Sequence, residues 1–204
     1  MLKSFRGGFT LAEVLITLGI IGVVAAMTMP TLLNSTNGAQ YRTAYKKALS
    51  VLSQAVVLNV ALDDYDLSQA TTSSDTDTAK ASLYSLFRNR MNVVSDSGTS
   101  NVDSWTAGND NSAKFGDGSN YTMFFNDGIS FTFAKSAAQC TQTNPCKGAI
   151  DINGAKNPNK VVACDSASGE CKVTNPTDIY PVIMYDQSVL PNSNAARAVL
   201  YGGK

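Results

Sequence analysis

The sequence contains one long apolar run near its start, and this run limits what the chain can fold into more than any other feature. Residues 9–29 read FTLAEVLITLGIIGVVAAMTM, and Glu13 is the only charged side chain among them. As a helix rising about 1.5 Å per residue, the run would extend about 30 Å, enough to cross the hydrocarbon core of a bilayer. We therefore predict a helix over residues 9–30 that crosses a membrane or packs among other apolar helices. The rest of the 204-residue chain suffices for one modest globular domain.

The eight residues before this run read MLKSFRGG, and Lys3 and Arg6 are their only charged side chains. Positive charge beside an apolar helix favours the cytoplasmic side of a membrane. We therefore expect residues 1–8 to form a cytoplasmic leader, with a single membrane pass and the globular domain outside the cytoplasm.

Glu13 needs a physical explanation, because an ionised carboxylate inside a membrane helix costs several kcal/mol unless a partner compensates it. Cleavage after Gly8 would create a new α-amino group on Phe9, close to Glu13 along the chain. We expect Glu13 of one subunit to pair with the Phe9 amine of a neighbour. Such a pair would fix the axial register of packed helices, since a misplaced helix would leave the carboxylate unpaired.

Residues 8–13, GFTLAE, resemble the prepilin peptidase signature of type IV pilins and type II secretion pseudopilins. The resemblance implies that Gly8 ends the leader, that Phe9 becomes the N-methylated first residue, and that Glu13 acts in assembly. Pro30 falls where many members have a proline that bends the stalk helix. The implied partners are prepilin peptidase, homologous subunits, an inner-membrane assembly platform and membrane lipid. The implied location is the bacterial inner membrane, followed by a periplasmic or extracellular filament.

An ordinary signal peptide or a plain membrane anchor would also show a basic start and an apolar run. Val24-Ala25-Ala26 offers small residues at which a signal peptidase could cut. Neither alternative gives a reason for Glu13 or for Gly8-Phe9 at the front of the run. The competing function is a secreted or membrane-anchored ligand-binding domain that uses this segment only for export.

After Pro30 the apolar residues become one-sided, which predicts an amphipathic stalk helix over residues 31–66. The expected buried stripe consists of Tyr41, Ala44, Tyr45, Ala48, Leu49, Leu52, Ala55, Val56 and Leu62. A secondary expectation is that the other side of this helix contacts neighbouring subunits. Residues 34–38 are poor helix formers, so a kink or loosening is expected there.

Residues 67–204 are expected to form the head, with a short helix, a β-sheet and cysteine-containing loops. The polar segment 68–78 predicts an exposed connection, and residues 96–117 predict a loop that Trp105 pins to the core. The expected regular elements are a helix over 79–91, a hairpin of 121–125 and 129–133, and strands over 149–152, 160–163 and 179–185. Pro181 suggests that the last of these strands is an edge or irregular strand. The predicted fold class is α+β, with a long N-terminal helix and a small antiparallel sheet, which is pilin-like.

The four cysteines are grouped in the last third of the chain: Cys140, Cys146, Cys164 and Cys171. An even number behind an export segment predicts disulfides formed in an oxidising compartment. Three pairings are possible, and short loops favour Cys140 with Cys146 and Cys164 with Cys171. A four-cysteine zinc site is the alternative, although its ligand pairs usually lie closer together in sequence than these do.

Composition argues against an enzyme and against a nucleic-acid partner. The chain has no histidine, and 16 basic and 16 acidic residues give a formal net charge of zero. The absence of histidine removes the commonest general base and the histidine-containing zinc sites. The acidic groups at Asp63, Asp64 and Asp66 and at Asp75 and Asp77 lie in exposed surroundings, where carboxylates are not tuned for catalysis. We assign no catalytic residue and expect no nucleic-acid partner.

The segment 151–159, DINGAKNPN, resembles one found in pseudopilin-like heads. Oxygens of Asp151 and Asn153 could bind calcium, but Lys156 adds positive charge and no acidic residue follows where a calcium loop needs one. Asp and Asn also form such turns unaided. We favour the turn and expect no cofactor, with calcium as the weaker alternative.

Overall fold

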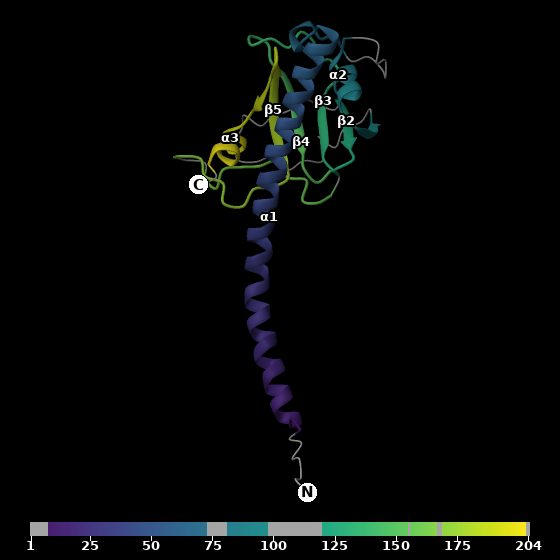
Figure 1. The fold of residues 1–204 in the computed structure, drawn as a ribbon. Helices are drawn as coiled ribbons and strands as arrows, with labels where there is room; N and C mark the ends of the chain where they lie inside the picture. The colour runs from purple at the N-terminus through teal and green to yellow at the C-terminus, as the bar shows by residue number, and fades with distance from the viewer. Residues whose placement is uncertain (1–7, 73–80, 98–119, 155, 167–168, 203–204) are drawn as a thin grey trace. The chain divides into compact units, whose positions relative to one another are not determined.

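The computed structural model describes residues 8–72, 81–97, 120–154, 156–166 and 169–202. Its elements are α1 (Leu11–Asp63), η1 (Leu67–Gln69), α2 (Leu83–Arg90), β1 (Val93–Ser97), β2 (Asn120–Phe125), β3 (Ser130–Ala134), β4 (Cys146–Asp151), β5 (Ile179–Tyr185), β6 (Ser188–Pro191) and α3 (Asn194–Tyr201) (Figure 1). The chain divides into two compact units, which we call the N-terminal unit (residues 1–37) and the globular unit (residues 38–204).

The N-terminal unit consists of the first part of α1 and the residues before it. Leu11–Pro30 has a mean hydropathy of 2.2, so this stretch is long and apolar enough to cross a membrane, judged by length and composition. The helical backbone continues through Pro30 and through residues 34–38. The loosening expected at residues 34–38 is therefore not observed.

The globular unit contains a six-stranded antiparallel sheet in the order β1-β2-β3-β4-β5-β6. Every strand pairs with its neighbours in sequence, so the sheet is a simple meander. The expected hairpin is confirmed: Met123 faces Phe131 and Tyr121 faces Phe133 across β2 and β3. Gly128 supplies the positive φ of +84° that the connecting turn needs. The α+β class and the antiparallel sheet are therefore as the sequence predicts.

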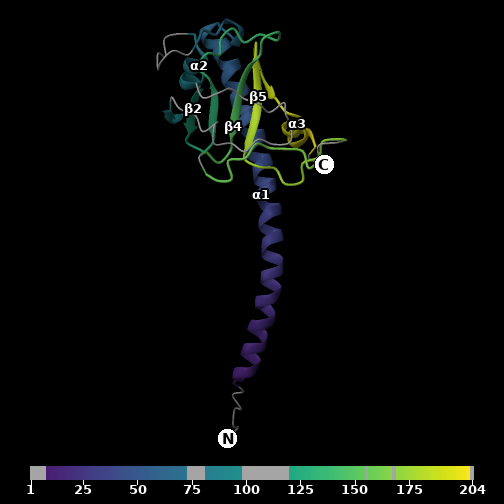
Figure 2. The same ribbon diagram turned by 180° about the vertical axis from the view of Figure 1, so that it is seen from behind.

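From Gly38 onward α1 covers one face of this sheet, and the strands lie in front of the helix when the molecule is seen from behind (Figure 2). Tyr45, Leu52 and Val56 of α1 are completely or almost completely buried in the core. The ring of Tyr45 stacks on that of Tyr180 in β5, with centroids 4.0 Å apart. The predicted stripe is correct over most of its length, but Leu62 is 66% exposed because it lies in the last turn of α1.

Two predicted strands differ in the structure. Residues 160–163 do not form a strand but contain isolated bridges, of which that of Val161 to Ile179 is parallel. β5 is internal rather than an edge strand, because it pairs with β4 and with β6. Pro181 is tolerated because its backbone faces the end of β6, where its carbonyl accepts the Asn192 N–H at 2.9 Å. The missing Pro N–H therefore falls where the β5–β6 ladder ends.

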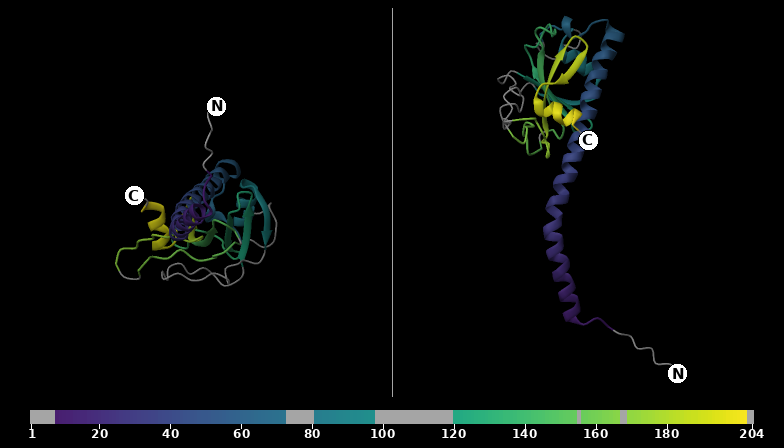
Figure 3. Two further views of the ribbon diagram at one scale, coloured as in Figure 1. Left: turned by 90° about the horizontal axis from the view of Figure 1, so that it is seen from below. Right: turned by 90° about the vertical axis from the view of Figure 1, so that its left-hand side faces the viewer.

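Four elements were not predicted: η1, β1, β6 and α3. Asp96 and Ser97, expected in a loop, belong to β1, which pairs with β2. α3 follows β6 closely and packs beside it (Figure 3). The predicted helix over 79–91 is present but begins only at Leu83, where Ser82 caps it. Trp105, Asp75 and Asp77 lie outside the described residues.

Candidate functional site

The start of α1 is the region to which the sequence assigns cleavage, methylation and assembly. Gly8, Phe9 and Thr10 precede the helix, and the side chain of Phe9 is 90% exposed. Glu13 Oε2 accepts hydrogen bonds from the Thr10 backbone N–H at 2.8 Å and from the Thr10 hydroxyl at 2.9 Å. The Glu13 N–H donates in return to the Thr10 hydroxyl at 3.3 Å. This reciprocal arrangement is a capping box that begins the helix.

The capping role of Thr10 was missed, although the spacing Thr-x-x-Glu before an apolar run announces it. The box supplies donors to Glu13 from its own chain, and the positive end of the helix dipole also favours a carboxylate at this position. Glu13 therefore has local compensation as soon as the helix forms. The additional pairing with a neighbour's Phe9 amine remains a prediction.

The other polar side chains of the apolar run are also satisfied within the helix. The Thr17 hydroxyl donates to the carbonyls of Glu13 and Val14, both at 2.9 Å. The Thr28 hydroxyl donates to the Val24 carbonyl at 3.0 Å. A helix whose polar groups are bonded internally can enter a membrane without leaving donors unpaired.

Large apolar side chains of the N-terminal unit are exposed at intervals from Phe9 to Leu32. They are Phe9, Leu11, Val14, Leu15, Ile16, Leu18, Ile20, Ile21, Val23, Val24, Met27, Met29 and Leu32. Such a continuous apolar surface is far larger than soluble proteins leave open to water. It therefore requires lipid or other apolar helices around it.

In the globular unit α1 also keeps apolar residues on its outer side. Val51, Val57, Leu58 and Leu62 are exposed, whereas Tyr45, Leu52 and Val56 of the same helix are buried. We call the four exposed residues the outer face of α1. Contact of this part of the helix with neighbouring subunits remains a prediction.

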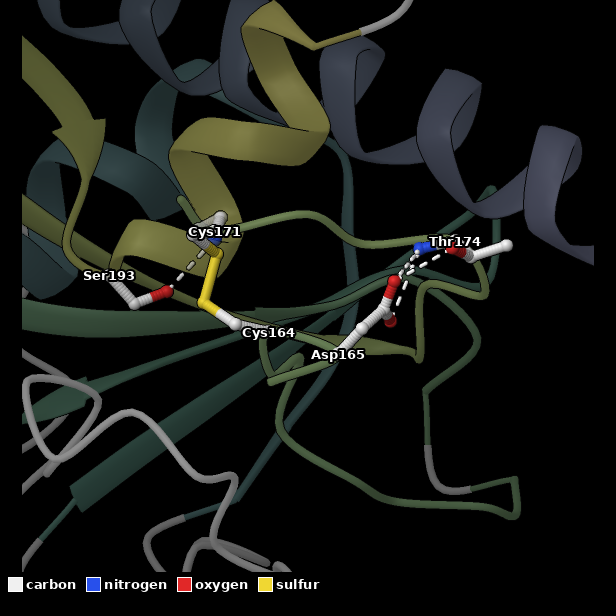
Figure 4. Close-up of a disulfide and its surroundings, with 6 residues drawn as sticks. Cys164, Asp165, Cys171, Thr174 and Ser193 are labelled. Atoms are coloured by element: carbon white, nitrogen blue, oxygen red, sulfur yellow. Dashed lines mark hydrogen bonds between the residues drawn. A yellow bond between two sulfur atoms is a disulfide. The ribbon is translucent and has the colours of Figure 1, made fainter. Parts of the chain in front are cut away.

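Both disulfides follow the short-loop pairing. Cys140 is joined to Cys146, and Cys164 is joined to Cys171. No cysteine is free, so the zinc alternative is wrong. The first disulfide is buried in the core, whereas the cysteines of the second are only partly buried and lie beside Ser193 at the start of α3 (Figure 4).

The segment 151–159 folds as a turn around a residue that the sequence analysis missed, the fully buried Asp178. Asp178 accepts the backbone N–H groups of Asn159 and Lys160, each at 2.8 Å. The Asn153 side-chain amide donates to Asp178 at 3.2 Å, and the Asn153 N–H donates to Asp151 at 3.1 Å. These contacts agree with the turn interpretation. The only sequence signal for Asp178 was its position just before an apolar strand.

Asp151 is an unusual carboxylate because it is buried in this turn. Burial raises the pKa of the Asp151 carboxyl to about 7, and the nearby Asp178 charge acts in the same direction. In the described part of the chain, no three or more His, Cys, Asp or Glu side chains are grouped as a metal site would require. Calcium binding at Asp151 and Asn153 therefore gains no support from a wider acidic cluster.

The acidic group at the end of α1 has structural roles. Asp63 forms an ion pair with Arg90, and Asp66 caps η1 by accepting the Ser68 N–H at 2.9 Å. These contacts explain the carboxylates without acid–base chemistry.

A cavity of about 450 Å³ lies in the globular unit between α1, the end of α2 and the β2–β3 hairpin. Its lining is mainly apolar, and its charged residues include Lys47 and Asp127, which pair with each other at 2.8 Å. The sequence did not predict it. The cavity has a size that could accept a small ligand.

Comparison with known proteins identifies the N-terminal region. Residues 3–29 match the family model of the prokaryotic N-terminal methylation motif, the prepilin-type signature of type IV pilins and pseudopilins. No curated protein and no solved structure matches the chain. The motif is that of a structural subunit rather than an enzyme, and it implies processing by prepilin peptidase and assembly with other pilin subunits. The apolar helix that carries it fits membrane anchoring.

Proposed function

We propose that the chain is the precursor of a filament subunit, cleaved between Gly8 and Phe9, methylated at Phe9 and held in the inner membrane by residues 9–30. The observation that carries this proposal is the methylation motif at residues 3–29, placed on an exposed apolar helix with one carboxylate in its first turn. The filament is a type II secretion pseudopilus or a type IV pilus. The globular unit lies outside the cytoplasm.

Cleavage and assembly are linked through the first turn of α1. Removal of residues 1–8 leaves a positive α-amino group on Phe9, directly before the capping box of Thr10 and Glu13. In a bundle of apolar helices, Glu13 gains most from a positive partner, because little water remains to solvate it. A neighbour's Phe9 amine supplies this charge only when the two helices are in the correct axial register.

The outer face of α1 supplies the second contact between subunits. Val51, Leu58 and Leu62 recur at helical spacing and present apolar surface to the surroundings of the globular unit. Covering these side chains in a filament would add hydrophobic stabilisation that an isolated subunit lacks. The apolar run of another subunit's helix has the matching chemistry.

The assembly role of Glu13 can be tested with Glu13→Gln and Glu13→Ala in cells that make the filament. Both variants should be inserted and processed normally, and their incorporation into sheared filaments should fall by roughly tenfold or more, because the charge pair is lost. Glu170→Gln is the matched control, since Glu170 is an exposed carboxylate of the globular unit. Incorporation of the Glu13 variants at the control level would contradict the pairing.

Deletion of the gene separates the two machines. A pseudopilin role predicts that folded exoproteins accumulate in the periplasm, whereas a pilin role predicts loss of surface fibres with secretion intact.

The competing function is an anchored ligand-binding domain, and the observation that favours it is the cavity between α1 and the hairpin. That function predicts that the chain stays monomeric in the membrane or is released without a methylated Phe9.

A further inference from the structure

The globular unit begins at Gly38, and the first turn of α1 within it rests on the segment that leads into β5. An ideal Cβ placed on Gly38 would lie 3.3 Å from Cδ of Pro176, so helix and segment are in close contact. One turn later, Arg42 Nη2 donates to the Val173 carbonyl at 2.5 Å. Residues 38–42 of α1 are thus held by residues 173–176, ahead of the Tyr45–Tyr180 stack.

The segment 173–176 is not part of the sheet, and it is held by the burial of Val173 in the core and by contacts with the residues just before it. Cys171 is joined to Cys164, and the Asp165 N–H donates to the Lys172 carbonyl at 2.8 Å. The Asp165 carboxylate accepts the Thr174 N–H at 3.0 Å and the Thr174 hydroxyl at 2.7 Å (Figure 4). We call Cys164–Asp165 together with Cys171–Pro176 the clasp.

The other disulfide is embedded in different contacts. Cys140 is fully buried, its N–H donates to the Leu67 carbonyl of η1, and its carbonyl accepts the Asp186 N–H, both at 2.9 Å. Cys146 lies in β4 opposite Met184 of β5. This disulfide therefore supports η1 and the sheet. The partly buried Cys164–Cys171 disulfide instead supports residues 173–176, on which residues 38–42 of α1 rest. The two disulfides should differ in their accessibility to a reductant. They should also differ in which part of the globular unit is loosened when the disulfide is removed.

We propose that the clasp is a redox-dependent fastening that docks residues 38–42 of α1 onto the globular unit only after Cys164 and Cys171 have joined. Closure forms one S–S bond from two thiols, while two electrons and two protons pass to the disulfide of an oxidising protein, which leaves as a dithiol. When Cys164 and Cys171 are reduced, residues 173–176 are no longer fixed, and residues 38–42 of α1 lose the surface on which they pack. This proposal holds whether or not the chain forms a filament, because it concerns only contacts within the globular unit.

Hydrogen exchange of the full-length protein in detergent micelles tests the clasp. The double variant Cys164→Ser/Cys171→Ser should exchange the α1 amides of residues 42–46 about tenfold faster than the wild type, with β3 and β4 unchanged, because only residues 173–176 are loosened. The double variant Cys140→Ser/Cys146→Ser is the matched control, and its increase should occur at η1 and β4. Unchanged exchange at 42–46 in the clasp variant would overturn the proposal.

A variant that leaves both disulfides intact covers the case in which cysteine removal unfolds the whole unit. Gly38→Val places a branched side chain against Pro176 and should accelerate exchange at residues 42–46 about tenfold. Ala39→Val is its control, since Ala39 is exposed. Val is a poorer helix former than Ala but a better one than Gly, so helix propensity alone would accelerate exchange in the control and not in Gly38→Val. Equal exchange in these two variants would overturn the docking role.

The redox dependence has its own readout in the wild-type protein. Under limiting dithiothreitol, iodoacetamide should alkylate Cys164 and Cys171 about tenfold faster than Cys140 and Cys146, because Cys140 and Cys146 are buried and Cys164 and Cys171 are only partly buried. Exchange at residues 42–46 should rise in step with the first modification. Simultaneous alkylation of all four cysteines would overturn the selectivity, and early alkylation without faster exchange would overturn the coupling.

Discussion

The two units use apolar residues in opposite ways, although one helix contributes to both. In the N-terminal unit the large side chains of α1 are exposed, whereas from Tyr45 to Val56 one side of the same helix is buried in the core beside the sheet. The described residues of the first region form no core, whereas the second region has a core that includes the Cys140–Cys146 disulfide. From this difference we expect the globular unit to be stable by itself, whereas the N-terminal unit reaches a low free energy only with lipid or with other helices.

The boundary between these two uses lies at Gly38. Substitutions before Gly38 change the exposed surface that α1 presents to lipid or to other helices. After it, they alter packing inside one unit. The following changes test this division in order of decreasing effect.

The largest contrast comes from the same truncation made in each unit. Leu52→Ala removes a side chain that is 1% exposed and should lower the free energy of unfolding of the globular unit by about 3 to 5 kcal/mol. Leu18→Ala removes one that is 60% exposed and should leave that free energy unchanged. Urea unfolding of the full-length protein in micelles, followed by near-ultraviolet circular dichroism, measures both. A comparable loss in the two variants would show that the units share one core.

The next effect depends on pH and belongs to the globular unit alone. The pKa of Asp151 is raised to about 7 by burial, whereas in the unfolded chain it is about 4. Between these values the unfolded chain loses this proton and the folded one keeps it, so stability from Asp151 is full below about pH 4 and falls as pH rises to about 7. The loss amounts to roughly 2 to 4 kcal/mol.

Asp151→Asn should remove this loss, since the amide cannot ionise and still offers an oxygen to the Asn153 N–H. The free energy of unfolding of the variant minus that of the wild type should therefore rise between pH 4 and pH 7. Urea unfolding at several pH values gives this difference. A difference that is constant with pH would contradict a buried, protonated Asp151.

The smallest contrast compares one helix cap from each unit. Ser193 Oγ accepts the Ala196 N–H at 2.9 Å and caps α3, so Ser193→Ala should destabilise the globular unit by about 1 kcal/mol. Thr10→Ala removes the cap of α1 and should not change the unfolding of that unit. The same urea titration distinguishes them. An effect of Thr10→Ala on globular unfolding would argue against independent units.

Much of the fold follows from local sequence patterns. The apolar run, the stripe on α1 and the hairpin with its Gly128 turn are all readable because side-chain periodicity and turn chemistry are local. β1 and β6 were missed because Val93–Ser97 and Ser188–Pro191 carry too few apolar residues to announce a strand, and pairing with neighbours decides their state. Pro181 led to the wrong expectation of an edge strand, because the free-energy cost of its missing N–H depends on where the adjacent strand ends.

The candidate site was also readable only in part. The motif at residues 8–13 is recognisable from the sequence alone, and the family match at residues 3–29 includes it. The turn at 151–159 was recognised, but its anchor Asp178 was not, because the two are far apart in sequence. The clasp depends on contacts between residues 38–42 and 173–176, which no local pattern reveals.

The central claim is that the N-terminal unit is made to be cut at Gly8–Phe9 and then surrounded by lipid or other subunits. Mass spectrometry of the protein purified from cells with and without prepilin peptidase tests it most directly. The account predicts an N-terminal peptide that begins with methylated Phe9 when the peptidase is present and with Met1 when it is absent. A mature N-terminus near Met27, or an intact Met1 in both strains, would contradict it.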